Sequence, residues 1–221
     1  MRIETGLGVV HLFARPTPML DREAVLAAIK HAVESDAQVV TAALLGHKAD
    51  LAVLALHPDW TVLRHLQSRL RNAGLGIVSS YVSLTEVSEY AKGMPEHMTQ
   101  PRLYPQLPPE GKPVFCFYPM SKARSAHANW YATPYEARDE MMREHGRSGR
   151  TFAGQVTQLV TGSTGLDSHE WGVTLFGVSP EVIKDVVYTM RFDRASALYG
   201  EFEDFYVGYI GEPDVILDAI A

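Results

Sequence analysis

The same order of predicted elements occurs twice in this chain, and this repetition restricts the fold more than any other feature of the sequence. In each half a strand runs directly into a helix opened at a proline, as in LAVLALHPDWTVL and later in WGVTLFGVSPEVI. Hydrophobic periodicity places each pair within a β-α-β-β-α-β order. This is the ferredoxin-like plan, with helices on one face of a four-stranded antiparallel sheet. We therefore expect an α+β protein whose two ferredoxin-like repeats close into a dimeric α+β barrel within one chain.

Alternating and helical patterns give approximate boundaries for these elements. In the first half we expect helices after an Asp21 cap and between Pro58 and Gly74, and strands at 7–13, 38–45, 51–56 and 76–82. In the second half we expect helices opened by Thr133-Pro134 and Ser179-Pro180, and strands at 114–118, 152–161, 170–176 and 202–209. A stretch rich in proline and glycine separates the halves. The predicted units are a first repeat at 1–90, a connecting segment at 91–112 and a second repeat at 113–221.

Composition excludes several classes of protein. The net charge of −6, without a cluster of Lys and Arg, argues against a nucleic-acid partner. Cys116 is the only cysteine, so a reducing compartment fits the chain and no intramolecular disulfide can form. The first residues lack a secretory pattern, and no apolar run approaches the roughly 18 residues that a membrane helix needs. We expect a cytoplasmic protein without a membrane span.

The stretch FCFYPMSK carries the strongest indication of chemistry. In a strand, Tyr118 shares a face with Val114 and Cys116, and Lys122 follows four residues later. Pro119 is expected to end the strand, because proline cannot donate to the ladder. An oxidisable phenol and a cation would then lie together at the mouth of a sheet. The simpler interpretation is a tyrosine that closes a core strand with its hydroxyl in water.

Two further residues have both a structural and a functional interpretation. His145 is expected at the end of a helix that stops at Gly146, where a histidine often serves as a partner of the helix dipole. A neutral imidazole on a rigid helix is also the usual proximal ligand of haem iron. Gln158 lies between Val156 and Val160 on one face of a strand. It needs a hydrogen-bond partner there, which is either another core group or a ligand bound against the sheet.

Several cations are predicted near the edges of the same region, which in an acidic protein suggests a ligand with several carboxylates. They are Arg102, Lys122, Arg150 and Arg191. Ser196 follows Arg191 closely and could add a neutral donor. Trp130 is expected to pack as a staple on the following helix, and Met120 to fill a gap in the core, although both lie close to Tyr118 in the sequence.

Five motifs taken together identify a known superfamily: CFYPMSK, NWY, HGRSGR, TGSTGLDSHEWGVTLF and YTMRFDRAS. The chain resembles the chlorite dismutase-like superfamily, and within it the coproheme decarboxylase branch of actinobacterial type. The resemblance covers nearly the whole chain, with the motifs concentrated from Tyr104 onward. It implies paired ferredoxin-like repeats, a porphyrin held in the C-terminal repeat, and a homopentamer.

The resemblance also implies roles for individual residues. His145 matches the proximal iron ligand, and Tyr118 matches the tyrosine that becomes a radical. Residues beside a reacting propionate are matched by Met120, Lys122 and Trp130. Residues that hold propionates are matched by Arg102, Arg191 and Ser196. Gln158 matches the distal glutamine.

The implied reaction is the decarboxylation of two propionates of iron coproporphyrin III (coproheme) to vinyl groups, with consumption of hydrogen peroxide. The product is haem b, formed through a three-propionate intermediate in late haem synthesis, and the iron porphyrin is substrate and redox cofactor at once. The resemblance further implies a transient contact with coproporphyrin ferrochelatase.

Alternative functions stay open on the sequence alone. One is a chlorite dismutase or a haem peroxidase, although residues 151–161 lack the distal arginine of chlorite dismutases. Another is a haem-binding barrel without turnover. Actinobacterial members of the branch use a distal histidine as base, and the sequence does not locate one, while Gln158 cannot itself act as a base.

Overall fold

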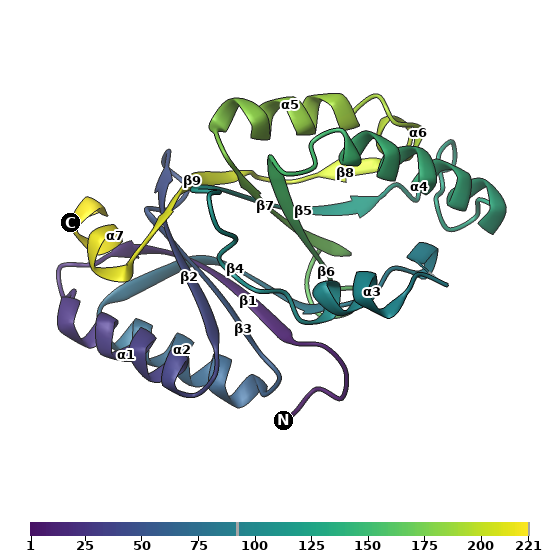
Figure 1. The fold of residues 1–221 in the computed structure, drawn as a ribbon. Helices are drawn as coiled ribbons and strands as arrows, with labels where there is room; N and C mark the ends of the chain where they lie inside the picture. The colour runs from purple at the N-terminus through teal and green to yellow at the C-terminus, as the bar shows by residue number, and fades with distance from the viewer. Residues whose placement is uncertain (92, 221) are drawn as a thin grey trace.

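The computed structural model describes residues 1–91 and 93–220 (Figure 1). The first half contains β1 (Gly8–Pro16), α1 (Arg22–Glu34), β2 (Gln38–Leu45), β3 (Leu51–His57), α2 (Trp60–Asn72) and β4 (Leu75–Thr85). The connection contains a short 3-10 helix, η1 (Glu89–Ala91), and α3 (Glu96–Leu103). The second half contains β5 (Val114–Lys122), α4 (Tyr135–Arg150), β6 (Val156–Gly162), β7 (Trp171–Gly177), α5 (Pro180–Met190), α6 (Arg194–Ala197), β8 (Gly200–Phe202), β9 (Tyr206–Gly211) and α7 (Pro213–Ile220).

The strands pair in the same order in both halves and close into a barrel. The order in the first half is β4-β1-β3-β2. The equivalent strands of the second half follow the same order, β9-β5-β7-β6, and all these pairs are antiparallel. The halves join where β4 pairs with β6 and where β2 pairs with β9. This confirms the predicted α+β barrel of two ferredoxin-like repeats. The division at 1–90, 91–112 and 113–221 into separate units stays a prediction.

The helices differ between the halves, and this difference positions the site. In the first half α1 and α2 bury a full apolar stripe against the outer face of the sheet, including Ile29 and Leu66. In the second half α4 is strongly polar, and among its described residues only Met141 is fully buried. Because α4 has no apolar stripe, it cannot lie directly on the sheet. The second half therefore leaves space between its sheet and α4, and a cavity lies there.

Alternation along β5 follows the sequence prediction. Phe115 and Phe117 point into the barrel, where they pack with residues of the first half. Cys116 and Tyr118 point outward and pack under α5. A strand with both faces buried explains why this segment reads as almost continuously apolar.

The sequence prediction for the end of β5 is wrong. Pro119 does not end β5, which continues to Lys122. The reason is that β5 changes neighbour at this point, pairing with β9 up to Phe117 and with β8 from Met120. The missing N–H of Pro119 therefore falls in a gap of the ladder.

Helix α4 also differs from the prediction at both ends. It runs through Gly146 to Arg150, so His145 lies within the helix and not at its end. A glycine inside a helix costs only about 1 kcal/mol, which tertiary contacts can offset. At the other end, Thr133 does not cap the helix, because its hydroxyl donates to the carbonyl of Asn129.

The remaining differences concern boundaries. The strand expected at 152–161 begins at Val156, after a turn, and the strand expected at 202–209 is divided into β8 and β9. The predicted caps at Asp21 and Ser179 are confirmed, since their side chains accept from the N–H groups of Ala24 and Val182. No helix among residues 1–91 and 93–220 combines the length and the apolar character that a membrane crossing requires.

Candidate functional site

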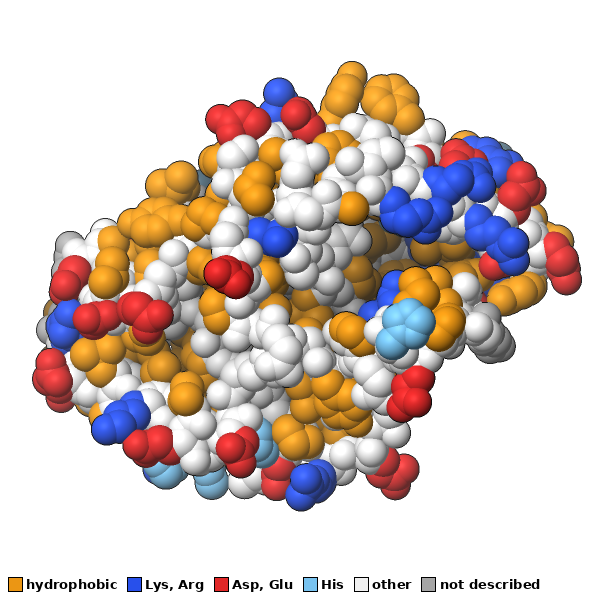
Figure 2. Space-filling model, viewed as in Figure 1, with side chains coloured by type: hydrophobic (Ala, Val, Ile, Leu, Met, Phe, Trp, Pro, Cys, Tyr) orange, Lys and Arg blue, Asp and Glu red, His pale blue; other side chains and the backbone are white. Residues whose placement is uncertain are grey.

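A cavity of about 680 Å³ occupies the space between the second sheet and its helices. Strands β5, β6 and β7 form one wall, while α3, α4, α5 and α6 contribute to the others. Figure 2 shows this hollow on the surface, with Lys and Arg side chains near its mouth. Apolar walls with a few polar groups are typical of a site for a large organic ligand.

The structure brings most of the sequence-predicted site residues to this cavity. Its lining includes Arg102, Tyr118, Met120, Lys122, Trp130, His145, Gln158, Arg191 and Ser196. Arg150 is not among the lining residues and is exposed at the last position of α4. Its guanidinium lies back along the same helix, beside Gly146. The continuation of α4 past Gly146 explains this, because it turns Arg150 away from the cavity.

Tyr118 lies on the sheet wall and is 8% exposed. Its ring stacks on Phe205, with ring centroids 4.4 Å apart, and also contacts Phe202. Burial raises the pKa of the phenol, while the nearby Arg191 partly opposes this effect. Tyr118 is therefore a neutral phenol at physiological pH, and its oxidation must release a proton together with the electron.

Lys122 follows on the same strand and is an unusually buried cation, 6% exposed. Its Nζ donates to the carbonyl of Ala195 over 2.6 Å and lies 4.8 Å from the ring centroid of Trp130. Its backbone N–H donates to the carboxylate of Glu170 over 2.8 Å. Burial lowers the pKa of Lys122 to about 8, against the opposing charge of Glu170. The ammonium is therefore placed to hold an anion that enters the cavity.

His145 reaches the cavity from α4 and is fixed by a buried carboxylate. Its Nδ1 lies 3.1 Å from Oδ2 of Asp193, while the Ser148 hydroxyl donates to Oδ1 over 2.6 Å. Burial lowers the pKa of His145, Lys122 adds to this effect, and Asp193 opposes it. Because Nδ1 is engaged by a carboxylate, a metal would be bound through Nε2, an arrangement typical of metal-ligating histidines.

Cations and a hydroxyl lie at other parts of the wall. Arg191 is the C-cap residue of α5, and its guanidinium lies over the Phe202 ring, 4.2 Å from the centroid. Ser196 is buried on α6. Arg102 lies in the last turn of α3 and donates to the carbonyl of Met98 in its own helix. These groups can bind carboxylates from several directions.

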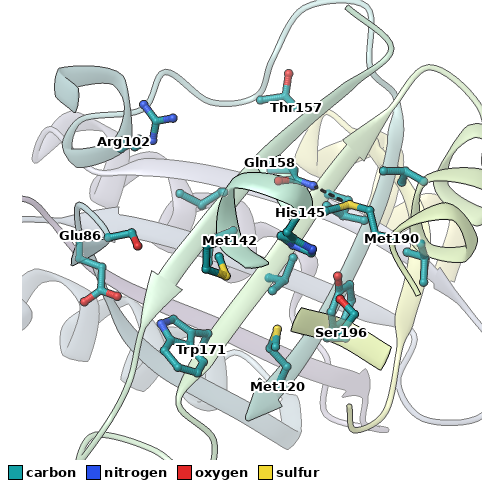
Figure 3. A pocket seen from close by; sticks show the side chains of 18 of the residues that line it. Glu86, Arg102, Met120, Met142, His145, Thr157, Gln158, Trp171, Met190 and Ser196 are labelled. Carbon is teal, nitrogen blue, oxygen red and sulfur yellow. Dashed lines mark hydrogen bonds between the residues drawn. The ribbon is translucent and has the colours of Figure 1, made fainter. Parts of the chain in front are cut away.

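Gln158 lies on β6 opposite the helices (Figure 3). Its side chain and that of Val160 face outward to the cavity, whereas Leu159 between them is buried in the barrel. The amide nitrogen lies 3.9 Å from the sulfur of Met190. Of the two sequence interpretations, the structure favours a glutamine that faces a ligand over one paired within the core.

Sequence reasoning missed four residues that contribute to the cavity or hold its side chains. They are Glu86, Glu170, Trp171 and Asp193. Asp193 pairs with His145, and Glu170 pairs with Lys122, each over 48 positions in the sequence. No local sequence pattern can predict contacts over such a separation. The signal that the sequence offered for Asp193 was an acid within the motif FDRAS, directly after Phe192.

No second histidine joins His145 among the described residues that line the cavity. The distal histidine expected for an actinobacterial type therefore has no counterpart in this wall, where Gln158 is found instead. The assignment to that type stays a prediction.

Comparison with known proteins gives the family. A model of the chlorite dismutase family matches residues 22–211, which is most of the chain. The chain belongs to the chlorite dismutase family. A Staphylococcus saprophyticus relative named coproheme decarboxylase is 42% identical over 188 residues, covering 80% of this chain and 75% of that protein. A Natronomonas pharaonis protein whose name describes it as heme-binding is 43% identical over 195 residues, but the match covers 32% of its length.

Comparison with solved structures supports the same fold. A heme-binding protein from Thermus thermophilus aligns with a TM-score of 0.87 at 34% identity, covering 98% of this chain and 95% of the other. A mutant chlorite dismutase from Candidatus Nitrospira defluvii aligns with a TM-score of 0.79 at 21% identity, covering 99% and 97%. The latter likeness concerns the fold alone.

Proposed function

We propose that this protein binds iron coproporphyrin III and decarboxylates two of its propionates to vinyl groups, giving haem b through a three-propionate intermediate. The observation that carries the proposal is the presence of Tyr118, Lys122 and His145 together in one cavity. The coproheme decarboxylase names of relatives at 40–42% identity support the same substrate.

The residues of the cavity fit an iron porphyrin with four propionates. His145, with its Nδ1 held by Asp193, would bind the iron through Nε2. Arg102, Lys122, Arg191 and Ser196 would hold propionates, and Trp130 and Met120 would lie beside a reacting one. The apolar side chains between these groups suit the flat face of a porphyrin.

The proposed chemistry uses hydrogen peroxide as the oxidant, and the bound iron supplies the activation of that peroxide. Tyr118 gives up an electron and its phenolic proton, and the resulting tyrosyl radical abstracts hydrogen from the β-carbon of a propionate. Loss of CO2 and of a second electron leaves the vinyl group, and the two electrons removed from each propionate reduce one hydrogen peroxide to two waters. Lys122 fixes the carboxylate during these steps, because its buried ammonium has few competing partners in water.

The first alternative, chlorite as substrate, is less well supported. Strand β6 carries Gln158 where chlorite dismutases carry an arginine, and β6 contains no arginine. A neutral amide stabilises developing negative charge less well than a guanidinium does. A haem-binding barrel without turnover has no need of the buried pair Tyr118 and Lys122.

The wider setting of this function is proposed on the family resemblance. We propose a homopentamer in the cytoplasm, with each protomer holding its porphyrin in the repeat at 113–221. Coproporphyrin ferrochelatase, which makes coproheme, is the partner proposed to deliver the substrate by transient contact.

The decisive experiment adds iron coproporphyrin III to the purified apoprotein, titrates hydrogen peroxide and follows the porphyrin mass. We expect two successive losses of a carboxyl group, by way of a three-propionate intermediate. Tight binding with bleaching but no loss of mass would contradict the decarboxylase. Dioxygen release from chlorite would then be measured next.

A further inference from the structure

Glu86 is out of place in a cavity for a ligand with four carboxylates. It is the only carboxylic acid among the described residues that line the cavity, and it follows directly on β4. The other ionisable lining residues are Tyr90, Arg102, Tyr118, Lys122, His145 and Arg191. An ionised Glu86, which is exposed on the cavity side, would repel propionates that bind beside it. A protonated Glu86 would not.

The surroundings of Glu86 are built to hold its carboxyl group. Gly162 ends β6 beside it, and any Cβ at that position would collide with the Glu86 carboxyl. The indole of Trp171 on β7 favours the ionised form of the same carboxyl, and Figure 3 shows the indole nitrogen turned toward it. Gly162 of β6 thus leaves room for the carboxyl group, and Trp171 of the neighbouring β7 places its indole beside it. The side chain is accessible from the cavity, so it can exchange protons with what the cavity contains.

The environment also favours the protonated form. Partial burial raises the pKa of Glu86, and the nearby Trp171 indole opposes this only partly. Propionates entering the same cavity would raise this pKa further, since like charges disfavour ionisation. Binding of the substrate should therefore protonate the Glu86 carboxylate.

The proposed reaction requires such a proton. Conversion of one propionate to a vinyl group releases CO2, one proton and two electrons. Reduction of one hydrogen peroxide to two waters takes up two electrons and two protons. Each decarboxylation therefore consumes one net proton, which must reach the oxygen that leaves as water. Gln158 cannot ionise, and Lys122 and His145 already hold a carboxylate and the iron in the proposed function.

We propose that Glu86 is the proton donor of the cavity, giving its proton to the departing oxygen of peroxide and regaining one from solvent after each turnover. This proposal rests on the proposed function. It assigns to a carboxyl group on the sheet wall the acid-base role that Gln158, on the same wall, cannot fill.

The first test compares Glu86→Gln with wild type and with Glu89→Gln. The glutamine keeps the size of the side chain and an acceptor for Trp171 but carries no proton to give. Glu89 lies three residues away, outside the cavity lining, where it pairs with Arg138. We expect Glu86→Gln to lower the rate of the first decarboxylation about 100-fold, within the range usual for general acid-base catalysis. Glu89→Gln should stay near the wild-type rate. An unchanged rate and pH profile in Glu86→Gln would overturn the proposal.

The second test is independent of turnover. Proton uptake on coproheme binding is measured near pH 6 by titration calorimetry in buffers of different ionisation enthalpy. Wild type should take up more protons than Glu86→Gln, and the variant should bind coproheme at least as tightly as wild type above pH 7. Weaker binding by the variant would make Glu86 a propionate contact and would overturn the proposal. If wild type itself does not decarboxylate coproheme, the proposed function fails, while the proton uptake still reports on Glu86 separately.

Discussion

Tyr118 shows at the residue scale how burial prepares one side chain for its proposed chemistry. We expect Tyr118→Phe to bind coproheme as wild type does, because the change removes one hydroxyl and little buried area. Decarboxylation should fall to about one hundredth or less, since no oxidisable phenol remains. Binding is measured by absorbance titration and turnover by porphyrin mass. The matched control is Tyr188→Phe, which alters an exposed tyrosine on α5. Normal turnover in Tyr118→Phe would remove Tyr118 from the mechanism.

Lys122 gives a prediction about stability and pH. The unfolded chain keeps this lysine protonated up to about pH 10.5, whereas the folded protein releases the proton near pH 8. The unfolded state therefore binds more protons in this window, and the free energy of unfolding gains a contribution that rises with pH. Relative to Lys122→Met, wild-type apoprotein should become more stable by up to ~3 kcal/mol between pH 8 and 10.5. Urea unfolding across this range measures the difference, and parallel curves would show that Lys122 titrates normally.

The residues of the site were largely predictable, but their supports were not. Tyr118 and Lys122 stand in one short motif, and strand alternation places Tyr118 on the outer face. The contacts of His145 with Asp193 and of Lys122 with Glu170 join positions 48 residues apart. Such contacts depend on how α6 and β7 meet the site, which a local pattern does not encode.

At the scale of the elements, patterns of hydrophobicity predicted whether a segment is a helix or a strand better than they predicted where it begins and ends. The bounds of β2 match the expected 38–45, because a buried strand alternates or runs apolar throughout its length. Glycine and proline led to wrong ends for one helix and one strand, because tertiary contacts there override local preference. Gly146 lies within α4, and Pro119 lies within β5 at the change from β9 to β8. Local propensity is therefore a weak guide at such places.

Strand β9 provides the prediction at this scale, because it joins the two halves. Gly208 pairs with Leu44 of β2 and with Phe115 of β5, and a Cβ there would collide with the backbone carbonyl of Ala43. We expect Gly208→Ala to lower the free energy of unfolding by roughly 2–4 kcal/mol. Gly211→Ala on the same strand should cost less, because its Cβ would meet the adaptable side chain of Ile216 at 3.1 Å. Equal stabilities of the two variants in urea would contradict this reasoning.

At the scale of the whole molecule, one plan occurs twice, and its two copies differ in what they cover. The first half covers its sheet with the amphipathic helices α1 and α2 (Figure 1). In the second half a cavity lies between the sheet and the polar α4. The polar composition of α4 was visible in the sequence. Its consequence was not, because the size of the gap depends on how α3, α5 and α6 close around it.

The barrel core should make the halves depend on each other. Phe13 of β1 stacks on Tyr206 of β9, with centroids 3.8 Å apart, and Phe117 of β5 packs against both. Either half alone would expose this inner face together with two sheet edges. We expect residues 1–112 and 113–221 to be unfolded or aggregated when produced separately, and to recover native circular dichroism and coproheme binding when refolded together. Cooperative unfolding of residues 113–221 alone, with porphyrin binding, would instead show that the second repeat is an independent domain.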